Sequence, residues 1–421
     1  MRVFKFGGAS VKDANGVKNV LKVLRKKGFS NLVIVVSAMG KTTNALEQLV
    51  ELYCSNNTLE LEKEISVIEK YHQNILATLF EDKQHAVFKK TEGLFADMRM
   101  TLKRNKSTQY DYIYDQIVCY GELISTTIIS EYLNHTGYKN KWLDARNFIK
   151  TNTVYRDAEV NWEGTQNLIS DKVNKNGLSV TQGFIGSDDN NFTTTLGREG
   201  SDYTAGIFAY CLNADSVSIW KDVPGVLNAD PRVFDTTELL SHISYEEAIE
   251  LAFYGASVIH PKTIQPLQRK EIPLYVKSFI DPSNSGTTVK KGQPLEPHLP
   301  CYIVKKNQIL LSLSSLDFSF IVEKNISEIF NLFHQYHIKV NLIQNSAISF
   351  SVCLSDKFNH FEILLNTLKA KFKVTYNTNV SLFTIRHFTN EAIASIEKNK
   401  NILLKQITRE TYQMVTSDYR V

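Results

Sequence analysis

Three segments of this sequence gather residue types that could bind a phosphorylated ligand. The first, Lys5–Val11 (KFGGASV), sets a lysine two residues before a pair of glycines, Gly7 and Gly8. The lysine supplies positive charge, and glycines let backbone amides approach an anion at a strand-to-helix turn. A plain turn would need the glycines but not the lysine. The segment is neither a Walker loop nor a GxGxxG motif.

The second segment, Thr193–Gly206 (TTTLGREGSDYTAG), combines hydroxyl groups with an arginine and an aspartate at the start of a predicted helix. Arg198 suits bidentate recognition of a carboxylate. Asp202 suits contact with an amino group or with the phosphate-binding lysine. Ser201 or Asp202 could instead be only the N-cap of the helix. That alternative does not explain the arginine.

The third segment, Trp220–Val233 (WKDVPGVLNADPRV), leaves a strand and supplies Asp222, Asp230 and Arg232. This segment could instead be only a turn-rich surface loop. Two shorter pieces accompany it: SAMGKTTN at 37–44, and YGELIST at 120–126, where Glu122 interrupts an apolar helix stripe. A buried glutamate is costly unless paired, so we expect Glu122 to meet a cation, either Arg198 or a substrate amine.

The elements that must position these residues follow an α/β pattern. A strand at 3–6, a helix ending at Gly28 and a continuous apolar strand at 32–37 predict a right-handed parallel unit. Residues 44–135 read as almost entirely helical. Strands near 178–181, 217–220 and 274–276 then alternate with helices near 202–212 and 244–255. We expect an αβα sandwich with a helical insertion over residues 1–290.

The pattern changes after a segment rich in proline and glycine, 281–300, which is the best linker candidate. Residues 309–376 read as β-α-β-β-α-β, a ferredoxin-like unit. A second, incomplete copy follows, with a strand at 380–385, a helix near 390–398 and a strand at 411–416. We expect two modules in 300–421, the first at about 314–376 and the second formed by 302–313 and 377–421.

Composition excludes several other classes of protein. The net charge of +4 comes from 48 basic and 44 acidic residues that are not clustered, so no nucleic-acid partner is expected. Five scattered cysteines without a CxxC pair predict buried free thiols in a reducing compartment. The histidines show no metal-ligand spacing, so we predict no metal site made by protein side chains alone. Without an apolar leader or a long apolar span, a cytoplasmic location with no membrane contact is expected.

Taken together and in this order, seven motifs resemble the aspartate kinases, members of the amino-acid kinase superfamily. They are KFGGASV, SAMGKTTN, GELIST, TQGFIGSD (181–188), TTTLGREGSDYTAG, WKDVPGVLNADPRV and GASVIHP (255–261). The resemblance implies an ATP-dependent phosphotransferase that moves the γ-phosphate of ATP to the β-carboxylate of L-aspartate. The products would be 4-phospho-L-aspartate and ADP, in the first step of lysine, threonine and methionine biosynthesis, with Mg²⁺ as cofactor.

The resemblance also implies a role for each matching residue. Lys5 and Asp202 would be catalytic. Aspartate would be held by Thr43, Glu122, Arg198 and Ser201. The ATP site would comprise Lys5, Phe6, Gly7, Gly8, Lys221, Asp222, Leu227, Arg232 and Ser257. Family members commonly carry an aromatic residue where Leu227 stands and a lysine or glutamine where Ser257 stands, so this chain departs from the family there.

The chemistry agrees with those roles. An aspartate side chain, with a pKa of about 3.9, is already ionised at pH 7 and needs no general base. The barrier lies in bringing two anions together, which calls for fixed cations, backbone amides and magnesium.

The C-terminal modules resemble the paired ACT modules of these kinases, so we expect a homodimer formed through them. Lysine-sensitive members carry a glycine in the loop before the first ACT helix and an acidic residue at each end of the next strand. This chain has LDFSFIVEKN (316–325) without glycine, and Asn341 and Ala347 stand where the acids are expected. We therefore predict weak or absent feedback by lysine.

Three alternative functions fit this sequence less well. Another kinase of the same fold could phosphorylate glutamate, N-acetylglutamate or a nucleotide, but the ACT-like tail and the SDYTA motif argue against it. A non-catalytic amino-acid sensor would be expected to have lost Lys5, Arg198 or Asp202, and all three are present. A fusion to homoserine dehydrogenase is not expected at this length.

Overall fold

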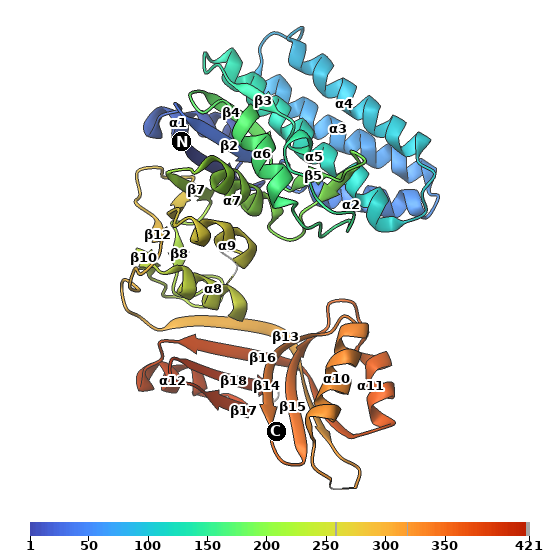
Figure 1. Cartoon of the computed structure of the whole chain (residues 1–421), viewed down its shortest axis with the longest axis vertical. Helices are drawn as coiled ribbons and strands as arrows, with labels where there is room; N and C mark the ends of the chain where they lie inside the picture. Colours follow the sequence, from blue (N-terminus) through green and yellow to red (C-terminus); the bar gives the residue numbers. More distant parts are fainter. Residues whose placement is uncertain (257–258, 318, 418–421) are drawn as a thin grey trace. The chain divides into compact units, whose positions relative to one another are not determined.

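The computed structural model describes residues 1–256, 259–317 and 319–417, which divide into two compact units (Figure 1). The first unit comprises Met1–Val226, Leu239–Ile249 and Val258–Glu296. The second comprises Leu227–Glu238, Glu250–Ser257 and Pro297–Val421. Residue 257, proposed above for the ATP site, lies outside the described residues.

The first unit is built on an eight-stranded sheet in the order β10-β12-β11-β7-β1-β2-β4-β3. Its strands are β1 (Arg2–Phe6), β2 (Leu32–Val36), β3 (Lys141–Leu143), β4 (Leu178–Gln182), β7 (Ser216–Lys221), β10 (His242–Ile243), β11 (Leu274–Ser278) and β12 (Thr287–Val289). All neighbours pair in parallel except β11 and β12. Every residue of β2 is buried, as expected for a parallel strand covered on both faces.

The first helix of this unit begins and ends where local signals predict. In α1 (Ala14–Lys27), the side chain of Asp13 caps the first turn, three basic residues occupy the last turn, and Gly28 at φ 81° ends the helix. The other elements are α2 (Thr42–Cys54), α3 (Thr58–Leu79), α4 (Ala86–Arg104), α5 (Tyr110–His135), η1 (Ala145–Asn147), α6 (Trp162–Lys172), β5 (Ile185–Ser187), β6 (Thr193–Thr195), α7 (Gly200–Leu212), β9 (Leu239–Leu240) and α9 (Pro261–Arg269). Strand β8 (Val226–Leu227) and helix α8 (Tyr245–Tyr254) have residues in both units.

The helical insertion spans α2 to α5. Helix α2 packs against α3 and α5, and α4 packs along α5, so the four helices form one bundle beside the sheet (Figure 1). Its apolar stripes are buried, as the periodicity predicts: Ile65, Ile68, Ile75 and Leu76 on α3, and Ile117, Leu123, Ile124 and Ile128 on α5.

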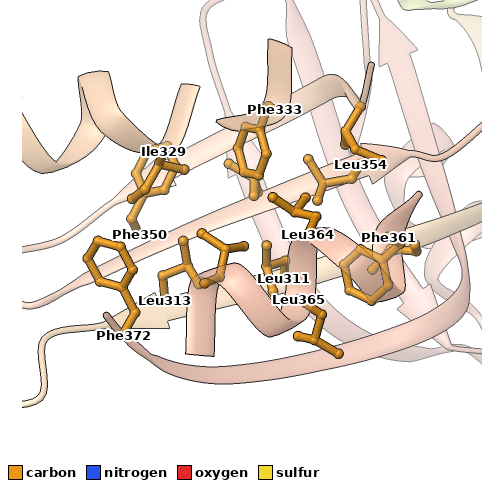
Figure 2. Packing of buried hydrophobic residues seen from close by; sticks show 14 of the residues in the cluster. Leu311, Leu313, Ile329, Phe333, Phe350, Leu354, Phe361, Leu364, Leu365 and Phe372 are labelled. Carbon is orange, nitrogen blue, oxygen red and sulfur yellow. The ribbon is translucent and has the colours of Figure 1, made fainter. Parts of the chain in front are cut away.

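The second unit contains a six-stranded antiparallel sheet in the order β14-β15-β13-β16-β18-β17. Its elements are β13 (Cys301–Ser314), α10 (Glu323–Gln335), β14 (Lys339–Asn345), β15 (Ser349–Ser355), α11 (Phe361–Lys369), β16 (Lys373–Arg386), α12 (Asn390–Glu397), β17 (Asn401–Ile407) and β18 (Thr411–Ser417). The core between α10, α11 and this sheet includes Leu311, Phe333, Phe350 and Leu364 (Figure 2).

Strands β13 and β16 run through both halves of this sheet. Residues 309–314 of β13 pair with β15, and residues 301–305 pair only with the second half of β16. The register shifts between Lys305 and Gln308, where Asn307 has a positive φ of 54°. The bulge lets one long strand serve two adjacent βα modules.

Three sequence expectations need correction. Residues 281–300 are not only a linker, because they include β12, which pairs with β11. Strand β17 was missed in the second module. Of the five free cysteines, four are buried as predicted, but Cys54 is exposed because it is the last residue of α2.

Candidate active site

The carboxyl ends of β1, β2 and β7 meet at one edge of the parallel sheet. In the ladder, Phe6 is paired with both Val36 and Trp220, so the chain leaves all three strands at the same level. Ligands of open α/β sheets bind outside this edge. The three segments that follow these strands are the predicted glycine loop, the SAMGKTTN loop and the start of the WKDVPGV segment.

An ion-pair cluster forms the centre of this edge. Lys5 Nζ on β1 lies 2.6 Å from Asp202 Oδ1, and Lys221 Nζ at the end of β7 lies 3.5 Å from Asp202 Oδ2. Asp202 is in the first turn of α7, and its side chain is fully buried. Two ammonium groups thus share one carboxylate, which leaves this cluster with one excess positive charge. The structure brings the two predicted catalytic residues into direct contact.

Electrostatics keep the Asp202 carboxylate ionised. Burial alone would raise its pKa, but the charges of Lys5 and Lys221 outweigh burial and hold the pKa of Asp202 below its usual value. An ionised Asp202 fixes both ammonium groups in place. Fixed cations cost no reorganisation when an anion arrives.

The two glycines of the first loop lie in different surroundings, and only Gly8 is required by a close backbone contact. A Cβ on Gly7 would lie 3.4 Å from Lys5 Nζ, so the ammonium group lies directly beside this backbone. A Cβ on Gly8 would lie only 2.6 Å from the carbonyl oxygen of Ala38, and the N–H of Gly40 donates to Gly8 O at 3.0 Å. Only glycine fits at position 8, because the loops after β1 and β2 interlock there.

The backbone of Phe6 lies at the same edge of the sheet, whereas its side chain is buried in the core. The ring is fully buried and stacks on Trp220, with the centroids 6.2 Å apart and the planes 13° apart. Only its backbone is available to a ligand. Phe6 therefore anchors the glycine loop to the core.

Glu122 on α5 is fully buried and only half satisfied. Its Oε1 accepts the N–H of Ala38 at 3.2 Å, whereas Oε2 has no hydrogen-bond partner among the described residues. Burial raises the pKa of Glu122 to about 8. The sequence predicted that Glu122 would pair with either Arg198 or a substrate amine. Arg198 does not pair with Glu122, because it is exposed and forms no ion pair within the described part of the chain.

Ser201 and Asp202 are not the N-cap of α7. The N-cap is Glu199, which has a left-handed φ of 56° and makes no side-chain cap bond, so the alternative reading of these two residues is wrong. Ser201 is instead buried against Gly183, where a Cβ would lie 2.4 Å from Ser201 Oγ. The sequence offered Gly183 only as part of the TQGFIGSD motif, without this reason.

Thr43 lies in the first turn of α2, directly after the loop that interlocks with the glycines. The N-cap residue of this helix, Lys41, makes no side-chain cap bond, and no acidic residue lies in the first turn. An uncapped helix start of this kind attracts anions. Thr43 itself is half-buried.

The other predicted nucleotide residues are divided between the units. Asp222 follows Lys221 in the first unit and is exposed. Leu227 and Arg232 belong to the second unit, where Arg232 Nη2 donates to Asp230 Oδ2 at 2.7 Å. That short-range pair holds the pKa of Asp230 below its usual value.

The described residues contain no group of three or more His, Cys, Asp or Glu side chains able to hold a metal ion. Mg²⁺ commonly keeps several waters and is bound through one or two carboxylates plus substrate phosphates. The exposed Asp222 beside Lys221 is compatible with that mode of binding. No described helix combines the length and apolarity needed to cross a membrane.

Comparison with known proteins identifies the family. A model described as the amino acid kinase family matches residues 1–278. Lysine-sensitive aspartokinase 3 of Escherichia coli (strain K12) is 33% identical over 356 residues, which cover 84% of this chain and 78% of that protein. The chain belongs to the aspartokinase family. Chloroplastic aspartokinase 2 of Arabidopsis thaliana is 30% identical over 373 residues, 84% of this chain and 66% of that protein.

Solved aspartokinase structures agree over nearly the whole chain. E. coli aspartokinase III in complex with aspartate and ADP matches with a TM-score of 0.83 and 28% identity, covering 99% of this chain and 96% of that one. The same enzyme in complex with lysine and aspartate matches with a TM-score of 0.81 and 29% identity, covering 99% and 95%. The predicted family, α/β fold class and ATP-dependent kinase class are confirmed.

Proposed function

We propose that this aspartokinase transfers the γ-phosphate of ATP to the β-carboxylate of L-aspartate, giving 4-phospho-L-aspartate and ADP. The observation that carries the proposal is the cluster of Lys5, Asp202 and Lys221 beside the Gly7 backbone. Its excess positive charge, held by a buried carboxylate, suits a reaction whose main obstacle is repulsion between two anions. Lys5 and Lys221 draw the phosphates and the attacking carboxylate together, and Asp202 orients both lysines.

Aspartate would lie between α5, α2 and the start of α7. Oε2 of Glu122, which has no hydrogen-bond partner in the described part of the chain, is a buried acceptor suited to the substrate ammonium group. The exposed guanidinium of Arg198 is suited to the α-carboxylate, which it can bind with two parallel hydrogen bonds. Thr43 and Ser201 supply hydroxyls from two helix starts. E. coli aspartokinase III, which matches over nearly all of this chain, binds aspartate and ADP.

The nucleotide would lie over the glycine loop. The backbone amides near Gly7 and Gly8 and the ammonium of Lys221 suit the phosphates, and Phe6 contributes through its backbone. Mg²⁺ would arrive bound to the phosphates and supply further positive charge, with Asp222 as the carboxylate near it. Leu227, Arg232 and Ser257 remain predicted contacts from the family resemblance.

A coupled assay of ADP release tests the proposal. With ATP and Mg²⁺ present, ADP should form with L-aspartate and not with glutamate or N-acetylglutamate at equal concentration. Faster turnover of either alternative acceptor would overturn the substrate assignment. The place of the reaction as the first step towards lysine, threonine and methionine stays a prediction, as does the cytoplasmic location.

We further propose that feedback by lysine is weak. Asn341, which stands where lysine-sensitive relatives have an acid, is already fully engaged within the second unit. Its Oδ1 accepts Lys305 Nζ at 2.9 Å, and its Nδ2 donates to Gln308 Oε1 at 2.8 Å and Ser355 Oγ at 2.6 Å. The ammonium group of Lys305 is thus already bound to Asn341 Oδ1, the oxygen that the ammonium group of an effector lysine would need.

Turnover measured with and without millimolar lysine or threonine tests this point. We expect less than about a twofold change with lysine. Strong inhibition would mean that the ACT pocket binds lysine by other contacts. E. coli aspartokinase III, whose complex with lysine and aspartate is known, provides the positive control.

A homodimer through the ACT modules is supported by the surface around β14. This strand is at one edge of the six-stranded sheet. Exposed apolar side chains lie on β14 or in the loops near it: Leu316, Phe320, Val322, Ile343 and Ile348. An open strand edge with apolar neighbours favours pairing with a second copy. Light scattering should give a dimer mass for the wild type and a lower mass for Ile343→Lys.

A further inference from the structure

A tyrosine from the helical insertion reaches both loops that build the active-site edge. Tyr71 lies on α3, and its hydroxyl donates to the backbone carbonyl of Lys12, in the segment that follows the glycine loop. The same hydroxyl lies 2.8 Å from the position that a Cβ on Gly40 would take. Gly40 belongs to the loop after β2. One side chain therefore hydrogen-bonds one loop and packs against the other.

The two loops depend on each other at this point. Gly40 N–H donates to Gly8 O at 3.0 Å, and Gly40 has a positive φ of 59°. Its nearest side-chain neighbours are Tyr71 and Lys12. A shift of Tyr71 would therefore change the packing at Gly40 and the bond from Gly40 to Gly8.

The surroundings hold the Tyr71 side chain in position. The neighbouring His72 is completely buried, packs its ring against those of Tyr71 and Phe95, and contacts Ile68 O through Nδ1 at 2.8 Å. Burial lowers the pKa of His72 to about 4, so the imidazole is neutral at pH 7. Burial, together with the charge of Asp13, raises the pKa of Tyr71, so its hydroxyl stays a donor.

We infer that Tyr71 is a positioning residue for phosphoryl transfer, because it fixes the loop after β1 relative to the loop after β2. The inference rests on the proposed function, which assigns phosphates to the first loop and aspartate to the helix that follows the second. A displacement of about 1 Å between bound reactants can cost roughly a hundredfold in rate. The helical insertion thus contributes to catalysis without touching a substrate.

The first test compares two tyrosines of the insertion. Tyr53 on α2 is a matched control, because its hydroxyl also donates to a backbone carbonyl, that of Leu102 at 3.1 Å. We expect Tyr71→Phe to lower kcat about tenfold with smaller changes in KM, and Tyr53→Phe to leave kcat within about twofold. Both variants should show similar melting temperatures. Equal kcat values for the two variants would overturn the inference.

The second test is a double-mutant cycle with Gly40→Ala. The Tyr71 hydroxyl is 2.8 Å from the new Cβ, whereas the next atoms, Lys12 Cβ and Tyr71 Cζ, are at 3.5 and 3.7 Å. Strain from the positive φ is common to both backgrounds and cancels in the cycle. Gly40→Ala should therefore lower kcat/KM at least threefold more in the wild type than in Tyr71→Phe. Additive effects would contradict the inference.

ADP affinity, measured without amino acid, separates this inference from the proposed function. Failure of the wild type to turn over aspartate would overturn the proposed function alone. The inference would still be tested, because Tyr71→Phe should weaken ADP binding about threefold while Tyr53→Phe does not. Equal ADP affinities for both variants in that case would overturn it.

Discussion

Two polar clusters, one in each unit, differ in how far their hydrogen-bonding groups are satisfied within the chain. Around Asp202, two lysines share one carboxylate, and in the same unit Glu122 keeps one carboxyl oxygen without a partner among the described residues. Around Asn341, every side-chain polar atom is engaged, with Lys305 held between Asn341 Oδ1 and the carbonyl of Phe253, 2.9 and 3.3 Å away. The first cluster has an unmatched acceptor, whereas both polar side-chain atoms of Asn341 in the second have partners within the chain.

This difference distinguishes a binding site, where a polar group lacks a partner until a ligand binds, from a structural cluster, where the polar groups find partners within the chain. Buried polar groups are normally satisfied, so an unsatisfied one calls for an explanation. At Glu122 the explanation is a substrate that supplies the missing donor. At Asn341 no such donor is needed, because the chain supplies its own ammonium group. The comparison predicts large functional effects in the first cluster and smaller, structural effects in the second.

The largest effect is expected for Lys5→Ala. This change removes the ammonium group at the centre of the positive cluster, and turnover should fall about a hundredfold or more, on the scale of losing a preorganised charge contact. Steady-state ADP release measures it. Lys90→Ala is the control, because Lys90 pairs with Glu131 at 2.5 Å within the helical insertion. Near-normal turnover of Lys5→Ala would remove Lys5 from the mechanism.

The next effect concerns Glu122 and depends on pH. Because burial raises its pKa to about 8, Glu122 is mostly protonated at pH 7, and the ammonium of aspartate must bind the ionised form. The affinity for aspartate should therefore rise as pH increases from 6.5 to 8.5. In Glu122→Gln the KM for aspartate should be at least about tenfold higher at pH 8 and nearly independent of pH.

A control for this prediction lies on the same helix. Glu131→Gln changes a partly exposed carboxylate of α5 that pairs with Lys90, and the pH dependence of KM should remain. A KM profile of Glu122→Gln that matches the wild type would mean that the substrate amine binds elsewhere.

The sequence alone predicted the parts of the site where residue type carries the chemistry. Lys5 beside two glycines, and Asp202 in the SDYTA motif, are unusual enough to stand out from ordinary core patterns. Their direct contact arises because α7, which carries Asp202 in its first turn, packs against β1, which carries Lys5. The roles of Thr43 and Ser201 came only from family resemblance, because single hydroxyls at helix starts are common.

Other features depend on tertiary contacts that no local pattern reveals. Tyr71 lies in an ordinary amphipathic helix, and only the fold shows that its hydroxyl reaches Lys12. Phe184, between Gly183 and Ile185, has a positive φ of 70° that a phenylalanine rarely adopts, and tertiary contacts must maintain it. Strand β12 is too short, and too close to proline and glycine, to be separated from a linker by periodicity.

The smallest effect is expected for Lys305, in the cluster around Asn341. Burial, helped by the charge of Lys339, lowers the pKa of Lys305 to about 8 from its ordinary value of 10.5. Between these two values the unfolded chain holds a proton that the folded chain has released, so stability contributed by this group rises with pH across that window. Thermal unfolding of the wild type from pH 7.5 to 9.5 should show this contribution, and Lys305→Met should lose it. Lys405→Met, which removes a lysine paired with Glu397 on the same sheet, should retain it. An unchanged pH dependence of stability in Lys305→Met would show that the Lys305 ammonium group is not the group that titrates in this range. The contrast between the two clusters would then depend on Oε2 of Glu122 alone.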